Sequence, residues 1–441
     1  MLIRSFQAIA RFRHANNGNV AATFAVALVP LIATLGCAVD YSRAVELRGK
    51  MQSAIDAASV GSVARTSPGF IAAGAMTADG AIAAGVTDAT NIFNGNMSGR
   101  SGYTLSSFSA NVRKSANKVI STVEFSATVP TTFTSIIGWN ALTISGASTS
   151  TASMPAYIDF YLLLDNSPSM GVGATPTDVD KMVTSTSDKC AFACHDKGNN
   201  NNYYKLAKTL GVTTRIDVLR SATEQLMVKA KQTATYTSQF QMAIYDFGAS
   251  AQTAGLRALF ALSPNLDKAK TEAGKIDLMS VNGQNDNNDQ DTPYTTALPA
   301  LNKVIADPGA GTAAAPQKYV FFVSDGVADE YNPAGCTKPT TGGRCQSPIN
   351  PNLCKTLTDR GIKVAVLYTT YLALPTNQWY NDWIKPFNTG PYGPSPNSQI
   401  ANNMKACASP GFYFEVSPTQ GISDAMNALF EKAVADARIS S

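Results

Sequence analysis

The stretch Tyr157–Gly171, YIDFYLLLDNSPSMG, decides the expected fold of this chain. Its first half, Tyr157–Leu164, is a largely apolar run of strand length, which is typical of a parallel strand buried on both faces. The run leads into the pattern D-x-S-x-S, formed by Asp165, Ser167 and Ser169. Because ligands bind at the carboxyl edge of open α/β sheets, these three side chains lie where a ligand is expected.

A carboxylate and two hydroxyls are hard oxygen donors, which suit Mg²⁺, Mn²⁺ or Ca²⁺ better than zinc or copper. A helix N-cap is the competing interpretation of the same residues, because Ser and Asp often cap helices. Two later segments favour the metal site. Asp291–Leu298, DTPYTTAL, opens a helical run that reaches about Ile305, and Lys318–Val323, KYVFFV, is a second buried strand followed by the tripeptide SDG with Asp325 at its centre.

In order and spacing, these segments resemble the metal-ion-dependent adhesion site (MIDAS) of von Willebrand factor A (vWA) domains. The resemblance implies five metal-binding residues: Asp165, Ser167, Ser169, Thr292 and Asp325. The two serines would bind the ion directly, and the two aspartates directly or through water. The threonine, in the family's T-x-x-x-x-A-L segment, would bind directly or through water depending on state. The implied ion is Mg²⁺, or Mn²⁺ or Ca²⁺, and a carboxylate from a protein partner would complete its shell.

The rest of the C-terminal region alternates between strand-like and helix-like stretches. This alternation predicts an α/β fold with a doubly wound parallel sheet, a Rossmann-like vWA domain over residues 156–437. The further expected elements are an amphipathic helix at Arg215–Lys231, strands at Phe240–Phe247, Ile362–Leu367 and Phe412–Val416, and a closing helix at Ser423–Ala437.

The N-terminal region predicts a membrane anchor. Residues 15–39 carry no charge, and Val20–Val39 is an apolar run of twenty residues. At 1.5 Å per residue such a helix spans a hydrocarbon core of about 30 Å, so a transmembrane helix is expected at about residues 18–39. A buried soluble helix, a cleaved signal peptide and a lipid-modified Cys37 are the alternatives. The helix is expected to continue unbroken into an amphipathic arm over Asp40–Ala64.

Three domains are expected. Residues 1–66 form a cytoplasmic tail, the transmembrane helix and the arm. Residues 67–155 form a small α+β stalk domain, and residues 156–437 form the vWA domain, with cysteine-containing inserts at 172–212 and 332–352.

Within the stalk, Ser67–Gly69 indicates a break, and an Ala-rich helix is expected at about Ala75–Phe93. Three stretches rich in Ser, Thr and Val predict strands. These strands are expected at Tyr103–Val112, Lys118–Val129 and Leu142–Thr151.

Besides Cys37, six cysteines lie in loop-like surroundings: Cys190, Cys194, Cys336, Cys345, Cys354 and Cys407. An even set of this kind favours disulfides and an oxidising compartment. The Lys and Arg counts on the two sides of the apolar run tie, so the cysteines decide the expected orientation, a cytoplasmic N-terminus with an exported body.

The segment Cys190–His195, CAFACH, is one residue too long for the C-x-x-C-H haem pattern. It shows only three ligands for zinc, so a local disulfide is the favoured interpretation. Cys336 with Cys345, and Cys354 with Cys407, are the other expected pairs, although the sequence alone does not fix the connectivity.

Motifs around the apolar run resemble the TadE/TadG-like Flp (tight adherence) pilus-assembly family. They are Gly18–Ala25, GNVAATFA, then Ala38–Tyr41, AVDY, and Met51–Ala58, MQSAIDAA. Many TadG-type members carry a C-terminal vWA domain. The resemblance implies a single-pass protein of the bacterial inner membrane, with its body in the periplasm or at the cell surface. Thr23 stands where relatives cleaved by prepilin peptidase have Glu, so the anchor is expected to be retained and not cut after Gly18.

The composition favours binding over catalysis or nucleic-acid recognition. The chain has 441 residues, 15% of them charged, and a net charge of only +4, which gives no sign of a nucleic-acid partner. Its two histidines leave little room for histidine base chemistry. The resemblances to the two families imply a membrane-anchored assembly or adhesion protein and no enzyme. Such a protein would bind a pilus component, a Tad secretion component or a surface ligand through its metal. The alternative is a minor pilin or tip adhesin within the pilus fibre.

Overall fold

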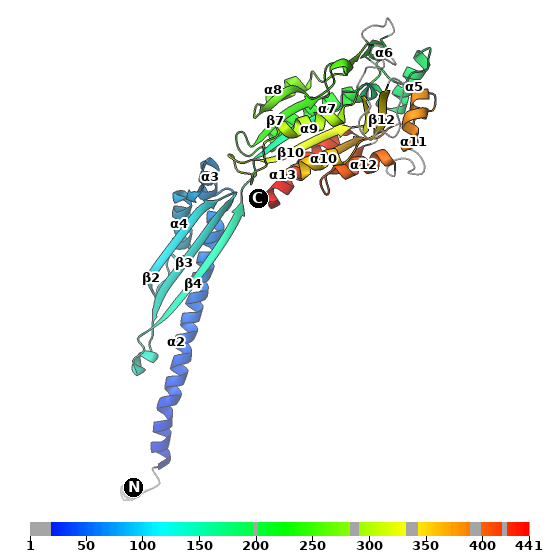
Figure 1. Ribbon diagram of the computed structural model, residues 1–441. Coiled ribbons are helices and arrows are strands. Elements are labelled where there is room, and N and C mark those ends of the chain that lie inside the picture. The colour runs from blue at the N-terminus through cyan, green and yellow to red at the C-terminus, as the bar shows by residue number, and fades with distance from the viewer. Residues whose placement is uncertain are drawn as a thin grey trace, which may run out of the picture. The chain divides into compact units, whose positions relative to one another are not determined.

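The computed structural model describes residues 19–193, 195–196, 202–282, 291–331, 343–371, 373–388, 398–416 and 421–440. The chain divides into two compact units, with the boundary between Met154 and Pro155. Each unit has its own sheet (Figure 1).

The first unit is organised by one long helix, α2, which runs unbroken over the 44 residues Asn19–Ser62. Its N-terminal part is apolar enough and long enough to cross a membrane. Most side chains there are exposed in the protein itself, including Val20 and Phe24. From Asp40 onward, one face of the same helix is buried against the rest of the unit. The expected continuation of the apolar helix into an arm is confirmed.

The sheet of the first unit is antiparallel, in the order β1-β2-β3-β4. Alternate side chains of β3, such as Val119, Val123 and Phe125, are buried, as expected for a sheet with one covered face. The strands are β1 (Gly80–Ala81), β2 (Thr104–Ser115), β3 (Lys118–Pro130) and β4 (Ala141–Ser153).

Helix α2 also covers the edge of strand β4. Arg48 Nε donates to the Ser145 carbonyl at 3.1 Å, and Gln52 Nε2 donates to the Ala147 carbonyl at 3.2 Å. An uncharged strand of 13 residues is otherwise a template for pairing with another chain. Helix α2 donates hydrogen bonds to these carbonyls, so the edge of β4 is less available for pairing with another chain.

The helices of the stalk differ from the sequence-based prediction. Two helices, α3 (Pro68–Ala75) and α4 (Ala83–Met97), replace the single one expected at about 75–93. The reason is local: the Ser67 side chain accepts a hydrogen bond from Phe70 N, and proline follows at the first helical position. Both features start helices, so the Ser-Pro-Gly segment begins α3, after α2 has already ended at Ser62.

The second unit contains a six-stranded sheet in the order β14-β13-β10-β5-β7-β8. All neighbouring pairs are parallel except β7 with the edge strand β8. The expected doubly wound parallel sheet is confirmed. The strands are β5 (Ile158–Leu164), β7 (Phe240–Asp246), β8 (Arg257–Ser263), β10 (Gln317–Ser324), β13 (Lys363–Thr369) and β14 (Tyr413–Val416).

Helices cover both faces of this sheet (Figure 1). Phe160 and Leu162 of β5 join a core with α7 (Arg215–Thr233), α8 (Leu266–Ala273) and α13 (Ile422–Ser440). Tyr161 and Leu163, on the other face of the strand, join a second core. Its helices are α9 (Tyr294–Val304), α10 (Asn352–Thr358) and α12 (Gln399–Cys407). This alternation explains why the strand reads as continuously apolar.

Shorter elements complete the second unit. They are the helices α5 (Pro176–Ser185), α6 (Tyr203–Thr209) and α11 (Lys385–Asn388), the helical turns η2 (Pro168–Gly171), η3 (Ala251–Thr253) and η5 (Tyr380–Ile384), and the strands β6 (His195–Asp196), β9 (Ser280–Val281), β11 (Val327–Tyr331) and β12 (Arg344–Pro348).

The cysteines follow the expected pairing only in part. The disulfide between Cys354 and Cys407 is confirmed, and it joins α10 to α12. Cys345 is also disulfide-bonded. Cys190 carries a buried free thiol, so the expectation of a local disulfide there is wrong. Its Sγ contacts the Phe192 carbonyl at 3.4 Å, and burial raises the pKa of the thiol to about 11, which keeps it protonated. Cys194 and Cys336 lie outside the described residues.

The Cys354–Cys407 bridge closes a long loop, with a sequence separation of 53 residues. A crosslink over such a loop restricts the unfolded chain and contributes about 2–4 kcal/mol. The double variant Cys354→Ala/Cys407→Ala is therefore expected to lose this much unfolding free energy in denaturant titrations of the full chain in detergent. The Cys190→Ser variant, which breaks no bridge, is the control. An unchanged midpoint in the double variant would contradict the prediction.

Candidate functional site

The predicted site lies at the carboxyl edge of the sheet in the second unit. Strands β5 and β10 are parallel neighbours, and Leu164 pairs with Val323 in register. The residues that follow therefore emerge side by side, and Asp165 N donates to the Val323 carbonyl at 2.9 Å. This pairing brings Asp165 beside Ser324 and Asp325, which lie 159 and 160 residues further along the chain.

The D-x-S-x-S loop is held by its own side chains. Asp165 Oδ1 accepts hydrogen bonds from Ser167 N at 2.9 Å and from Ser167 Oγ at 2.5 Å. The hydroxyls of Ser167 and Ser169 lie 2.9 Å apart. Ser324 Oγ donates to Asp165 Oδ2 at 2.5 Å, which ties the loop to β10.

The competing N-cap interpretation does not describe this loop. Ser167 precedes the turn η2, but its side chain makes no capping hydrogen bond to that turn. Its hydroxyl is directed to Asp165 and Ser169 instead. The oxygen atoms of the loop thus face one another and do not serve a helix end.

Asn166 holds the D-x-S-x-S loop in place through buried hydrogen bonds. This side chain is fully buried, donates through Nδ2 to the Gly248 carbonyl at 2.8 Å and accepts from Phe247 N at 3.1 Å. Its own carbonyl accepts from Met279 N at 2.9 Å. Sequence reasoning treated this residue as a variable position and missed its structural role, because its partners follow a different strand.

Asp325 faces a buried arginine. Neither residue is exposed beyond 2%, and Arg215 NH1 lies 3.7 Å from Asp325 Oδ2. The guanidinium also donates to the Thr370 carbonyl at 2.6 Å and lies 5.4 Å from the centre of the Tyr371 ring. Among the described residues, neither carboxylate oxygen of Asp325 has a well-formed hydrogen bond. Ser169 and Tyr371 lie near enough to favour its ionised form.

Sequence reasoning also missed Arg215. The residue is the first of α7, and a capping box between Thr214 and Asp217 fixes the start of that helix. The Thr-x-x-Asp pattern was available as a signal for the helix start. It gave no indication that the neighbouring arginine points into the sheet edge, because that depends on packing across the fold.

Burial raises the pKa of both carboxyl groups. For Asp165 the loss of hydration acts first and the charge of Asp325 adds to it, while hydrogen bonds from Ser167 and Ser324 oppose the shift. For Asp325 burial again raises the pKa, and the positive charge of Arg215 opposes it most strongly. Two ionised carboxylates in one buried site repel each other, so the doubly charged state needs a cation.

Thr292 is the predicted ligand with no hydrogen bond to the other four among the described residues. It is buried just before α9, and its backbone forms a bridge with Asp329, four residues beyond Asp325. In the part of the chain that the structure describes, its hydroxyl makes no hydrogen bond to the other four residues. Tyr294, two residues later, does reach the site, because its hydroxyl lies 2.5 Å from Ser324 Oγ.

The donor set fits a hard divalent cation. The converging groups are two buried carboxylates and two serine hydroxyls, with no nitrogen or sulfur donor that would favour a transition metal. The carboxylate oxygens of Asp325, which lack well-formed hydrogen bonds among the described residues, are acceptors that face the charge of Arg215. Among the described residues, no cluster of three or more His, Cys, Asp or Glu side chains could hold a metal ion.

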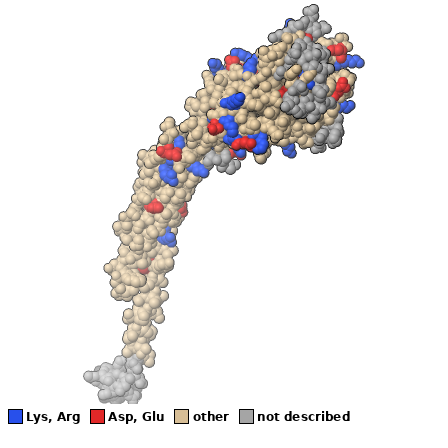
Figure 2. Space-filling model, viewed as in Figure 1, with Lys and Arg blue, Asp and Glu red and all other residues tan. Residues whose placement is uncertain are grey.

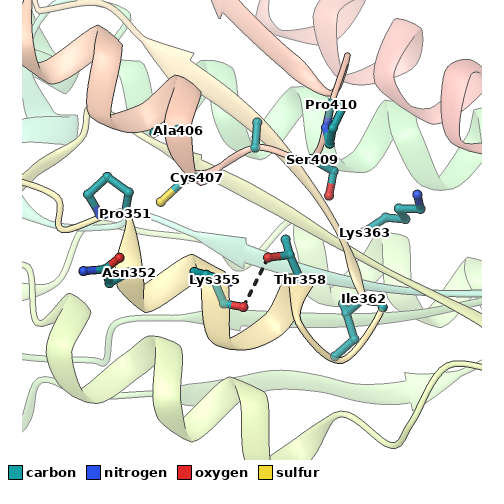
Figure 3. A pocket seen from close by; sticks show the side chains of 12 residues that line it. Pro351, Asn352, Lys355, Thr358, Ile362, Lys363, Ala406, Cys407, Ser409 and Pro410 are labelled. Atoms are coloured by element: carbon teal, nitrogen blue, oxygen red, sulfur yellow. Dashed lines mark hydrogen bonds between the residues drawn. The ribbon is translucent and has the colours of Figure 1, made fainter.

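A surface hollow lies at the opposite edge of the same sheet. Its volume is about 350 Å³, and it is lined by residues of α10, the start of β13 and the chain after α12 (Figure 3). Lys363 begins β13, whereas Asp165 and Asp325 follow the carboxyl ends of the parallel strands. The hollow is therefore separate from the carboxylate cluster.

Residues 18–65 match the family model described as putative Flp pilus-assembly TadE/G-like. The resemblance of the N-terminal motifs to this family is confirmed over those residues. No curated protein sequence matches the chain.

Several solved structures are similar at low identity. The vWF domain of the type V pili tip protein Mfa5 from Porphyromonas gingivalis is 10% identical, with 64% of this chain and 97% of that chain covered and a TM-score of 0.36. A point mutant of the PilB minor pilin from Streptococcus sanguinis is 11% identical, with coverages of 76% and 80% and a TM-score of 0.33. Proximal thread matrix protein 1 from the mussel byssus, with a zinc-occupied MIDAS motif, is 12% identical, with coverages of 64% and 46% and a TM-score of 0.32.

The raised pKa values predict an unusual pH dependence without metal. Between the unfolded pKa, near 4, and the higher folded pKa, the folded state binds more protons, so the free energy of unfolding falls as pH rises. In chelator, the full chain is expected to show this loss in thermal unfolding between about pH 4 and pH 7, because the pKa of Asp165 is raised to about 7. Replacing Asp165 with Asn removes one titrating group and is expected to flatten the curve.

The control for this series is Asp267→Asn, which changes an exposed carboxylate paired with Lys231. It should leave the slope of the wild-type curve unchanged. Parallel curves for wild type and Asp165→Asn would show that the buried pair does not titrate as described.

Proposed function

We propose that this chain is a membrane-anchored assembly or adhesion protein of a bacterial tight-adherence (Flp) pilus system. The observation that carries the proposal is the convergence of Asp165, Ser167, Ser169 and Asp325 at one sheet edge. The family match over residues 18–65 supports the pilus system, and the apolar part of α2 supports the anchor.

In this proposal the cluster holds one divalent ion, Mg²⁺ or alternatively Mn²⁺ or Ca²⁺. Ser167 and Ser169 offer hydroxyl oxygens, and Asp165 and Asp325 offer carboxylates. Thr292 is the proposed fifth ligand and would bind directly or through water. When bound, such an ion supplies an open position for a carboxylate of a protein partner, a pilus or Tad secretion component or a surface ligand.

The residues around the cluster have supporting roles. Asn166 fixes the loop backbone, so the two serine hydroxyls are held before any ion arrives. Arg215 offsets part of the charge of Asp325, which limits the repulsion between the carboxylates in the protein alone. The site is therefore suited to binding, and we propose no catalytic role for it.

We place the anchor in the inner membrane, with the N-terminus in the cytoplasm and the body in the periplasm or at the cell surface. The Cys354–Cys407 disulfide supports an exported body, because disulfides persist in oxidising compartments. The alternative function, a minor pilin or tip adhesin in the fibre, requires cleavage of the chain after Gly18. N-terminal sequencing of the mature protein distinguishes the two: a start at Asn19 favours the pilin.

The metal site is tested by calorimetry of the full chain with Mg²⁺ and Mn²⁺. Wild type is expected to bind one ion, and Asp165→Ala is expected to lose this binding, because the variant removes a carboxylate that also orders the serine loop. The same variant is expected to lose chelator-sensitive capture of pilus components and pilus-dependent adherence, with its circular dichroism spectrum unchanged.

The matched control is Asp246→Asn. Asp246 is equally buried and ends the neighbouring strand β7, but it is paired with Arg257 and has no part in the cluster. The Asp246→Asn variant should bind the ion with the affinity of the wild type. Equal affinity in wild type and Asp165→Ala would refute the proposed metal site.

A further inference from the structure

The turn between β3 and β4, residues 131–140, presents apolar side chains to the outside. It contains the short helical turn η1 (Thr134–Ile137). The hydroxyl of Thr134 donates to the Trp139 carbonyl at 3.2 Å, so the turn is closed by its own polar groups. Four large side chains project from it with exposed fractions of 81% for Ile136, 65% for Trp139, 58% for Ile137 and 38% for Phe133.

This apolar turn is tied to α2 at one level of the helix. The carboxylate of Asp40 accepts hydrogen bonds from the backbone N–H groups of Thr132 at 3.0 Å and of Phe133 and Thr134 at 2.8 Å. Phe133 packs against Gly36, where an added Cβ would lie only 2.4 Å from the phenylalanine Cβ. The contact therefore requires glycine and fixes the position of the turn along the helix.

That level is the end of the apolar span. Asp40 is the first charged residue after the run Val20–Val39, and Gly36 lies four residues before it, inside the run. At a rise of 1.5 Å per residue the contact with Phe133 lies about 6 Å below Asp40 along the helix axis. Apolar groups at a membrane surface are buried by about 5–10 Å, so the turn reaches the depth of the headgroup and acyl-chain boundary.

The composition around the turn fits the same place. Phe125–Ile158 contains no Asp, Glu, Lys or Arg. On the face seen in Figure 2, the part of the first unit formed by the N-terminal end of α2 shows no charged side chains. Tryptophan is enriched at membrane interfaces, where its ring is buried in the apolar layer and its N–H remains near water.

We infer that this apolar turn inserts into the interfacial layer of the lipid bilayer beside α2, as a second point of membrane contact. A membrane surface is favoured over a protein partner because the turn is fixed at the level where the proposed transmembrane helix leaves the bilayer. The inference rests on the membrane anchor of the proposed function. Two contacts, one through the helix and one through the turn, restrain the sheet of the first unit against tilting and rotation about α2.

Tryptophan fluorescence tests the inference, since Trp139 is one of three tryptophans. The variant Trp379→Phe/Trp383→Phe leaves Trp139 alone, and Trp139→Phe is the matched control that keeps the two tryptophans of the second unit. Both full-length chains are placed in phosphatidylcholine vesicles brominated near the headgroup end of the acyl chains. Trp139 is expected to lose most of its emission to the brominated lipid and to be shielded from acrylamide, whereas the control is not quenched by the lipid.

A second variant guards against a misfolded turn. Ile136→Asn/Ile137→Asn, made in the single-Trp139 chain, is expected to float with the vesicles through α2 but to lose lipid quenching of Trp139. The single-Trp139 chain with the unmodified turn could float with the vesicles and yet be quenched by acrylamide and not by brominated lipid. That result would overturn the inference but leave the membrane anchor standing. A chain that fails to float overturns the membrane anchor and the inference with it.

Discussion

The parallel pairing of β5 and β10 is the constraint on which the site depends. It places Asp165 and Asp325 at the same buried edge, although 160 residues separate them in the chain. Neither carboxylate is exposed, and the pKa of each is raised by the loss of hydration. A buried charge is costly unless it is paired, so the strand pairing creates a demand for positive charge at this edge.

The protein meets part of that demand with its own residues. Ser167 and Ser324 donate hydrogen bonds to Asp165, and Arg215 lies 3.7 Å from Asp325. The compensation is incomplete, because the oxygens of Asp325 lack well-formed hydrogen bonds among the described residues. A divalent ion would supply the remaining charge, and its binding would be linked to the ionisation of both carboxyl groups. The proposed partner would then bind where its own carboxylate completes the shell.

Much of the fold was predictable because its signals are local. The runs YIDFYLLL and KYVFFV are apolar on both faces, which indicated buried parallel strands, and the uncharged run Val20–Val39 indicated the apolar helix. The predictions that failed, or were not made, depended on local capping details or on contacts between elements far apart in the sequence. The Ser67-Pro68 helix start was taken for a break only, and Cys190 keeps its thiol in a buried setting. Arg215 and Asn166 reach the site through packing between distant elements, which spacing in the sequence does not encode.

The most direct measurement is the location of a bound ion. Crystals of the protein grown with Mn²⁺ would show the metal through its anomalous scattering. We expect one strong peak within coordination distance of Ser167 and Ser169, with Asp165 and Asp325 as direct or water-bridged ligands. A peak elsewhere, or none at this edge at saturating Mn²⁺ with Arg215 still paired to Asp325, would contradict the view that the buried carboxylates form a metal site.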